Sequence, residues 1–459
     1  MYQIDFQKPQ AVHFIGIGGI SMSGLAEILL EEGFRVSGSD SQKSPLTEHL
    51  EQKGARIFTG QKASNILEGT EVVVYTAAIH PDNPELMEAK RRQIPMLSRA
   101  ELLGEMMHNY RQAVAIAGTH GKTTTTSMMT EILLAAETDP TISIGGMLDS
   151  IHGNIRIGKS DLFVTEACEY TNSFLSFFPT VEIILNIEAD HLDFFKDLDD
   201  IRNSFRLFAE KLPADGAMII NSDIENYQEI IQNLNARIIT FGKDKNSTYQ
   251  AENITYDEFA RPSYDLIKEG EKIGHICLGV AGEHNVYNSL AAIGASFELG
   301  ITLEAIKRGL AGFSGPHRRF EKKGELHGIT IIDDYAHHPQ EIHATLTAAQ
   351  NYPHNRLWCI FQPHTYTRTK ALMDDFATAL AEADRVVLAD IYPARETDTL
   401  GISSADLAEK IEKLGTKVHY LSSFDEIENF LLENCVNGDL LITMGAGDIV
   451  KVGEKLLGQ

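Results

Sequence analysis

Short apolar runs alternate with longer amphipathic stretches along most of the chain. The apolar run 12–17 leads into a glycine turn, and apolar residues recur at helical spacing through 22–30. Further strands are expected at 35–40 and 72–75, and the stretch 99–108 is again helical in pattern. This order predicts βαβ units and a parallel, doubly wound sheet in the first segment.

The same alternation predicts two more α/β segments. After Gly118 the apolar spacing predicts a helix that packs on a sheet, and 247–277 alternates as antiparallel edge strands do. The third segment has continuous apolar runs, typical of a parallel sheet covered on both faces. The expected strands are 162–165, 181–185, 217–220 and 237–240 in the second segment and 330–332, 357–361, 386–388, 418–421 and 440–443 in the third, with helices at 373–383 and 404–414.

We therefore expect an α/β protein with three domains. They are a Rossmann-like domain at 1–108, a central P-loop-type domain with a mostly parallel sheet at 109–314, and a second Rossmann-like domain at 315–459. The length of 459 residues and the apolar content of 43% are sufficient for several cores.

Composition narrows the choice of partners. The chain has 65 acidic and 40 basic residues, a net charge of −25, which disfavours non-specific binding of nucleic acid. Its four cysteines are widely spaced without a C-x-x-C pair, as in a reducing compartment. The sequence has neither a signal-like N-terminus nor a run long enough for a membrane span, so we expect a cytoplasmic protein.

The strongest chemical signal is an apolar strand followed by a glycine turn, a lysine and a threonine run. Backbone N–H groups of such a loop hold phosphate oxygens, the lysine neutralises the β- and γ-phosphates, and the first threonine completes a Mg²⁺ shell. The common form of the motif has glycine where this chain has Ile116, and a structural turn is the alternative. The expected ATP-binding residues are Gly118, Thr119, His120, Gly121, Lys122, Thr123 and Thr124.

A second glycine loop lies near the N-terminus. It permits a diphosphate to approach a helix N-terminus, but a dinucleotide fingerprint would have glycine at Ser21. A sugar nucleotide is therefore favoured, with an NAD site or a structural turn as alternatives. The expected substrate-binding residues are Gly16, Gly18, Gly19, Ser21 and Asp40.

Acidic and imidazole groups follow two central strands. Glu166 and Glu169 leave the strand 162–165, and His191 follows the next one. Carboxyl ends of parallel strands are where such sheets bind ligands, and Mg²⁺ prefers oxygen ligands. We expect Glu169 beside Thr123 on one Mg²⁺ and His191 near a second; solvated strand ends are the alternative.

The last third of the chain carries further polar clusters. Asn285 and Asn288 share a helix face and could read a purine edge or act as caps. One of the adjacent Arg318 and Arg319 could clamp a γ-phosphate, with ordinary surface arginines as the alternative. His337, His338 and His364 suggest zinc, but no cysteine supports a metal, and polar substrate binding is favoured.

Taken together, these motifs resemble those of the Mur ligases over the whole chain. In order they are Gly16-Ile-Gly-Gly19, Gly118-Thr-His-Gly-Lys-Thr-Thr124, Asn186-Ile-Glu-Ala-Asp-His191, His284-Asn285, Arg318-Arg319, Asp334-Tyr-Ala-His-His-Pro339 and Met444-Gly-Ala-Gly-Asp448.

The resemblance implies a UDP-sugar-binding domain, a central ATPase and a C-terminal amino-acid-binding domain. We expect a monomer or a homodimer. It implies that the carboxylate of UDP-N-acetylmuramic acid attacks ATP, and that L-alanine then attacks the acyl phosphate. It places Thr123 and Glu169 on one Mg²⁺ and His191 on a second. It also places Asn285 and Asn288 at adenine, Arg319 and Asp334 at other parts of ATP, and Tyr335, His337 and Arg368 at alanine.

One position departs from the usual family pattern, and several alternative functions stay open. Many relatives have arginine where Thr365 stands, so alanine recognition rests more on Arg368. The nearest rival is a family member that recycles a murein tripeptide, and a folate polyglutamate ligase is more distant. An NAD-dependent oxidoreductase leaves the central loop unexplained, and a non-catalytic nucleotide switch predicts ATP binding without a new amide.

Overall fold

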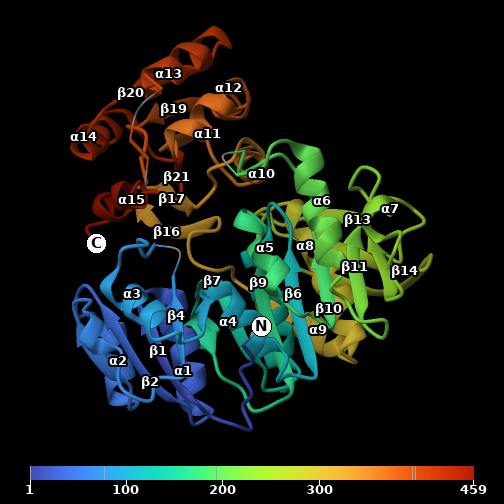
Figure 1. Ribbon diagram of the computed structural model, residues 1–459. Coiled ribbons are helices and arrows are strands. Elements are labelled where there is room, and N and C mark those ends of the chain that lie inside the picture. The colour runs from blue at the N-terminus through green and yellow to red at the C-terminus, as the bar shows by residue number, and fades with distance from the viewer. Residues whose placement is uncertain (1, 77, 193, 395, 398–399) are drawn as a thin grey trace. The chain divides into compact units, whose positions relative to one another are not determined.

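Three β-sheets follow one another along the chain in the computed structural model, which describes residues 2–76, 78–192, 194–394, 396–397 and 400–459 (Figure 1). Helices separate most strands, so the predicted α/β class is confirmed. The chain divides into two compact units. The first holds residues up to Glu188, Leu198–Ile239 and Ala295–Ile301; the second holds Ala189–Asp197, Thr240–Gly294 and Thr302–Gln459.

The N-terminal sheet is parallel, with the strand order β3-β2-β1-β4-β5. β1 ends at Ile15, earlier than predicted, because Gly16 turns the chain with a φ of +84°. Strand order reverses at β1, and the crevice at such a switch point is where doubly wound sheets bind ligands. The elements are β1 (Ala11–Ile15), α1 (Ile20–Glu31), β2 (Arg35–Asp40), α2 (Pro45–Gln52), β3 (Arg56–Thr59), β4 (Val72–Tyr75), α3 (Pro84–Arg91), β5 (Met96–Ser98) and α4 (Arg99–Met107).

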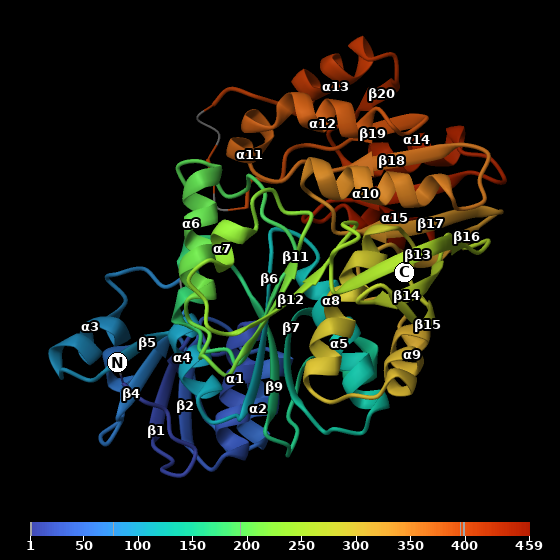
Figure 2. The ribbon, with the colours of Figure 1, turned by 90° about the vertical axis from the view of Figure 1, so that its right-hand side faces the viewer.

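The central sheet has the order β15-β14-β13-β12-β11-β10-β6-β9-β7-β8. β6 lies between β9 and β10 and is parallel to both, so its loop leaves from the middle of the sheet. The predicted antiparallel edge is confirmed as β13, β14 and β15 (Figure 2). The elements are β6 (Gln112–Ala117), α5 (Lys122–Ala135), β7 (Thr141–Leu148), β8 (Gly153–Arg156), β9 (Leu162–Ala167), β10 (Val181–Ile184), α6 (Leu198–Ala209), β11 (Ala217–Asn221), α7 (Gln228–Ile231), β12 (Arg237–Phe241), β13 (Tyr249–Tyr256), β14 (Pro262–Lys268), β15 (Glu271–Cys277), α8 (His284–Glu298) and α9 (Leu303–Gly312).

The C-terminal sheet has the order β16-β17-β21-β18-β19-β20 and is parallel except for the edge strand β16. Helices α10, α12 and α13 pack on one face and α14 and α15 on the other, as the continuous apolar strands predicted (Figure 1). The elements are β16 (Glu321–Leu326), β17 (Ile329–Asp334), α10 (Pro339–Gln350), β18 (Leu357–Phe361), α11 (Tyr366–Ala371), α12 (Met373–Leu380), β19 (Arg385–Leu388), α13 (Ser404–Lys413), β20 (Lys417–Tyr420), α14 (Phe424–Asn434), β21 (Leu440–Met444) and α15 (Val450–Leu456).

Within the described residues, none of the helices combines the length and the apolar character that crossing a bilayer requires.

Candidate active site

The loop between β6 and α5 has the backbone of a phosphate-binding turn. Gly118 and Gly121 have φ values of +145° and +84°, which favour glycine. A Cβ on Gly118 would also lie 2.9 Å from the Cβ of Leu185. Gly121 is the N-cap of α5 and supplies no capping side chain, so the N-terminal end of the helix offers backbone donors and a positive dipole to an anion.

Lys122 folds back over this loop. Its Nζ donates to the carbonyl oxygens of Gly118 and Thr119 and lies 3.0 Å from Oε2 of Glu169. Burial alone would lower the pKa of Lys122, but the charge of the Glu169 carboxylate outweighs it and the pKa is raised. Lys122 is therefore a fixed cation at the mouth of the loop.

The carboxylate next to Thr123 belongs to Glu166. Oε2 of Glu166 accepts from the Thr123 hydroxyl at 3.0 Å, and Oε1 accepts from the Gly145 N–H at 2.5 Å. The structure thus brings Glu166 to Thr123 and Glu169 to Lys122, whereas sequence reasoning paired Glu169 with Thr123. Two residues separate the carboxylates, and spacing alone could not assign them to partners.

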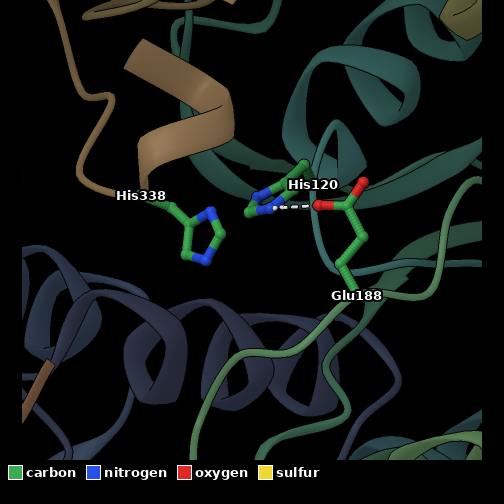
Figure 3. Close-up of side chains that lie close together, drawn as sticks. All are labelled: His120, Glu188 and His338. Carbon is green, nitrogen blue, oxygen red and sulfur yellow. Dashed lines mark ion pairs between the residues drawn. The ribbon is translucent and has the colours of Figure 1, made fainter. Parts of the chain in front are cut away.

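The segment after β10 supports the loop from the side. The Asn186 amide accepts from the His120 N–H at 2.8 Å and donates to the His120 carbonyl at 3.1 Å. The Glu188 N–H donates to the Thr119 hydroxyl at 2.9 Å. The His120 ring also lies 3.1 Å from the Glu188 carboxylate (Figure 3). Asn186 and Glu188 therefore fix the backbone that would meet phosphate.

The N-terminal glycine loop is held by the end of β2. The Asp40 carboxylate accepts from the Gly18 N–H at 2.9 Å, and a Cβ on Gly18 would meet the same carboxylate at 2.9 Å. Arg99, at the start of α4, donates to the Ser21 hydroxyl at 3.1 Å. This places a guanidinium at the N-terminal turn of α1, a setting that favours an anion. Sequence reasoning missed Arg99 because it lies 78 residues from Ser21.

The end of β17 carries a buried carboxylate. Asp334 accepts from the N–H groups of Phe320 and Ala336 at 2.8 and 2.7 Å. Burial raises its pKa to about 6, although the charge of Arg319 opposes this. The Arg319 guanidinium lies 5.4 Å from the Tyr335 ring centre. Asp334, Arg319 and Tyr335 are therefore brought together.

His337 and Arg368 lie at the same edge of the C-terminal sheet. The Nδ1–H of His337 donates to the Tyr335 carbonyl at 3.0 Å, which leaves Nε2 as an acceptor. Burial lowers the pKa of His337 to about 4, so its ring is neutral at pH 7. Arg368 lies 3.2 Å from the Asp190 carboxylate and 3.4 Å from Nδ1 of His364.

The two predicted adenine contacts are joined to each other. Asn288 donates to the Asn285 amide oxygen at 3.0 Å, and Asn285 donates to the Ala281 carbonyl at 2.7 Å. Both side chains are buried. These asparagines, His191, Arg319 and Asp334 belong to the second unit, whereas the phosphate loop belongs to the first. Their predicted roles on ATP and on a second ion remain predictions.

Models of three Mur ligase domains together match nearly the whole chain. The Mur ligase family catalytic domain matches residues 11–111, the Mur ligase middle domain matches 116–296, and the Mur ligase glutamate ligase domain matches 318–447.

Individual relatives match over the full length as well. A UDP-N-acetylmuramate–L-alanine ligase of Lachnospira eligens is 63% identical over 458 residues, and the match covers 100% of both chains. The crystal structure of the UDP-N-acetylmuramate-alanine ligase of Thermotoga maritima superposes with a TM-score of 0.80 at 30% identity over 98% of each chain. That of a murein peptide ligase from Psychrobacter arcticus gives 0.69 at 25% identity, also over 98% of each.

Proposed function

Because the chain belongs to the Mur ligase family, we propose that it is an ATP-dependent ligase that joins L-alanine to UDP-N-acetylmuramic acid. In this reaction the sugar carboxylate takes the γ-phosphoryl group of ATP, and the alanine amine then displaces phosphate. The products are the amide, ADP and phosphate, and the amide is a precursor of peptidoglycan. The full-length identity of 63% to a ligase of this name carries the proposal.

The phosphate loop supports the first step. A carboxylate and a triphosphate repel each other, so their reaction needs fixed positive charge. Lys122 supplies such a charge and is held by three protein oxygens. The uncapped start of α5 adds backbone donors, so the β- and γ-phosphates would bind at Gly118 to Thr124.

The residues beside Thr123 fit Mg²⁺. Mg²⁺ prefers hard oxygen ligands. The Thr123 hydroxyl and the Glu166 carboxylate offer two such oxygens, which lie 3.0 Å apart. We assign Glu166, in place of Glu169, as the carboxylate ligand, and Glu169 as the residue that fixes Lys122. Bound there, Mg²⁺ would neutralise charge on the triphosphate.

Two further surfaces fit the other substrates. The N-terminal loop, with Ser21 and Arg99, would bind the diphosphate of the UDP-sugar. Tyr335, His337 and Arg368, at the carboxyl edge of the C-terminal sheet, would bind alanine, with Arg368 on its carboxylate. The domain limits 108/109 and 314/315, a cytoplasmic location and a monomeric or dimeric state remain predictions.

The test is phosphate release with ATP, Mg²⁺ and UDP-N-acetylmuramate. L-alanine, glycine, L-serine and the murein tripeptide are compared as the amine. We expect release with L-alanine to exceed that with glycine and serine, and no release with the tripeptide. Release with the tripeptide alone would favour the recycling ligase, which the resemblance to the Psychrobacter arcticus structure keeps as the second candidate.

A further inference from the structure

Four loops leave the C-terminal sheet at the carboxyl ends of its strands. The strands β17, β21, β18 and β19 are neighbours and parallel, so their carboxyl ends lie side by side. Asp334 ends β17, Gly445 follows β21, Gln362 follows β18, and Tyr392 lies four residues after β19. The edge that carries the proposed alanine residues therefore also carries Gln362 and Tyr392.

Tyr392 is the last ring of a continuous aromatic row. The ring of Tyr335 lies 5.4 Å from that of His337, and the ring of His337 lies 5.8 Å from that of His364. His364 then stacks on Tyr392 at 5.5 Å with an interplanar angle of 17°. Since the row begins at Tyr335 and His337, Tyr392 extends the wall of the proposed amino-acid site.

The backbone fixes Tyr392 against the loop that carries Arg368. The Tyr392 N–H donates to the Pro363 carbonyl at 2.8 Å, and the Thr365 N–H donates to the Tyr392 carbonyl at 2.9 Å. Thr365 adopts a φ of +66° and a ψ of 143°, a conformation that costs a β-branched residue free energy. Two backbone hydrogen bonds therefore join Tyr392 to the loop that carries Arg368.

Gln362 presents an unused acceptor at this position. Gln362 as a residue is 6% exposed, and its Oε1 has no hydrogen-bond partner among the residues that the structure describes. A Cβ on Gly447 would lie 2.3 Å from this oxygen and 2.9 Å from the Tyr392 ring. Gln362 and Tyr392 thus border the same glycine, and only a glycine leaves room for both.

A buried acceptor without a partner costs free energy, and a donor that arrives with a ligand removes that cost. The carbonyls of Gly445 and Gly447 accept hydrogen bonds from Arg318, whereas the neighbouring Oε1 of Gln362 has no partner among the described residues. An amino acid brings a carboxylate for Arg368 and N–H donors from its amino group.

We propose that Gln362 is a substrate-binding residue of the amino-acid site, whose Oε1 accepts a hydrogen bond from the substrate amino group, and that Tyr392 and Gly447 position it. The inference rests on the proposed function. It adds an amine-binding residue to a site in which Arg368 binds the carboxylate.

Gln362→Met removes the Oε1 acceptor while the side-chain volume stays similar. Gln362→Glu keeps an oxygen at the Oε1 position. We expect Gln362→Met to raise the KM for L-alanine about 10-fold or more, with the KM values for ATP and UDP-N-acetylmuramate unchanged. Its Tm should equal or exceed that of the wild type, because the lost oxygen has no partner in the free protein. Gln362→Glu should stay within a few-fold of the wild type, and the exposed Gln350→Met is the matched control.

Ligand-observed NMR of the full chain with L-alanine separates the two proposals. If the wild type binds L-alanine and Gln362→Met binds it equally well, this inference is wrong and the ligase proposal stands. A wild type that binds alanine without releasing phosphate would refute the ligase proposal alone. If the wild type neither binds nor consumes an amino acid, both are wrong. A lower Tm of Gln362→Met with all three KM values raised would show a structural role instead.

Discussion

Nζ of Lys122 lies 3.0 Å from Oε2 of Glu169, and the two side chains are only 15% and 3% exposed. A buried ion pair of this kind gives little net stability, but removal of one partner leaves the other charge buried and unpaired. The pair therefore links the charge proposed to act on ATP to the stability of the first unit.

Lys122→Ala should lower kcat for ADP release by about 10³-fold or more, because a main charge clamp is lost. It should also destabilise the protein by about 3–5 kcal/mol, because Glu169 is left unpaired. Thermal unfolding and coupled ADP assays measure both effects. The double variant Lys122→Ala/Glu169→Gln should recover stability without recovering activity; recovery of activity would contradict the role of Lys122.

Glu166 and Glu169 can be distinguished by Mg²⁺ titration. Glu166→Gln weakens a carboxylate ligand beside Thr123, so the Mg²⁺ concentration for half-maximal ADP release should rise about 10-fold. Glu169→Gln should lower kcat with a smaller change in Mg²⁺ dependence, because its partner is Lys122. If Glu169→Gln raises the half-maximal Mg²⁺ concentration more than Glu166→Gln does, Glu169 is the ligand beside Thr123, as the sequence predicted.

His337 should make the protein acid-sensitive. Its folded pKa of about 4 lies below the ordinary value of 6.5, so the unfolded chain binds the proton first and stability falls as pH drops from 6.5 towards 4. The contribution is at most about 3 kcal/mol. Asp334 acts in the opposite direction, because burial raises its pKa to about 6. Urea unfolding at pH 7 and pH 5 should therefore show a smaller loss in His337→Asn, which keeps Asp334; an equal loss would contradict the assignment.

Glu182 lies in the middle of the central sheet, opposite Ala115 and Met218. It is fully buried, its carboxylate has no hydrogen-bond partner among the described residues, and burial raises its pKa well above 4.5. Stability is therefore lost as pH rises above 4.5. Glu182→Met should raise stability at pH 8 by about 1–3 kcal/mol, and by less at pH 5. Scanning calorimetry tests this, with the exposed Glu225→Met as control; a gain equal at both pH values would contradict the ionisation argument.

The strands and the phosphate loop could be predicted because each depends on local sequence. The run 181–185 appears as β10, and Gly118 and Gly121 adopt the positive φ values that such a loop needs. The pairing of Glu166 with Thr123 could not be predicted, since it depends on how β9 lies beside β6 and on the backbone of Gly145. Arg99 was missed because long-range packing brings it to Ser21. The proposed role of Gln362 rests on the burial of its Oε1 without a partner, which the local sequence does not show.

The central claim is that ATP activates a carboxylate rather than being hydrolysed. UDP-N-acetylmuramate labelled with ¹⁸O in its carboxylate tests it most directly, in a reaction with ATP, Mg²⁺, L-alanine and the full chain. If the carboxylate attacks the γ-phosphate, the released phosphate carries one ¹⁸O and the amide product retains the other. Mass spectrometry of the phosphate should show this transfer in each turnover, whereas unlabelled phosphate would contradict the account.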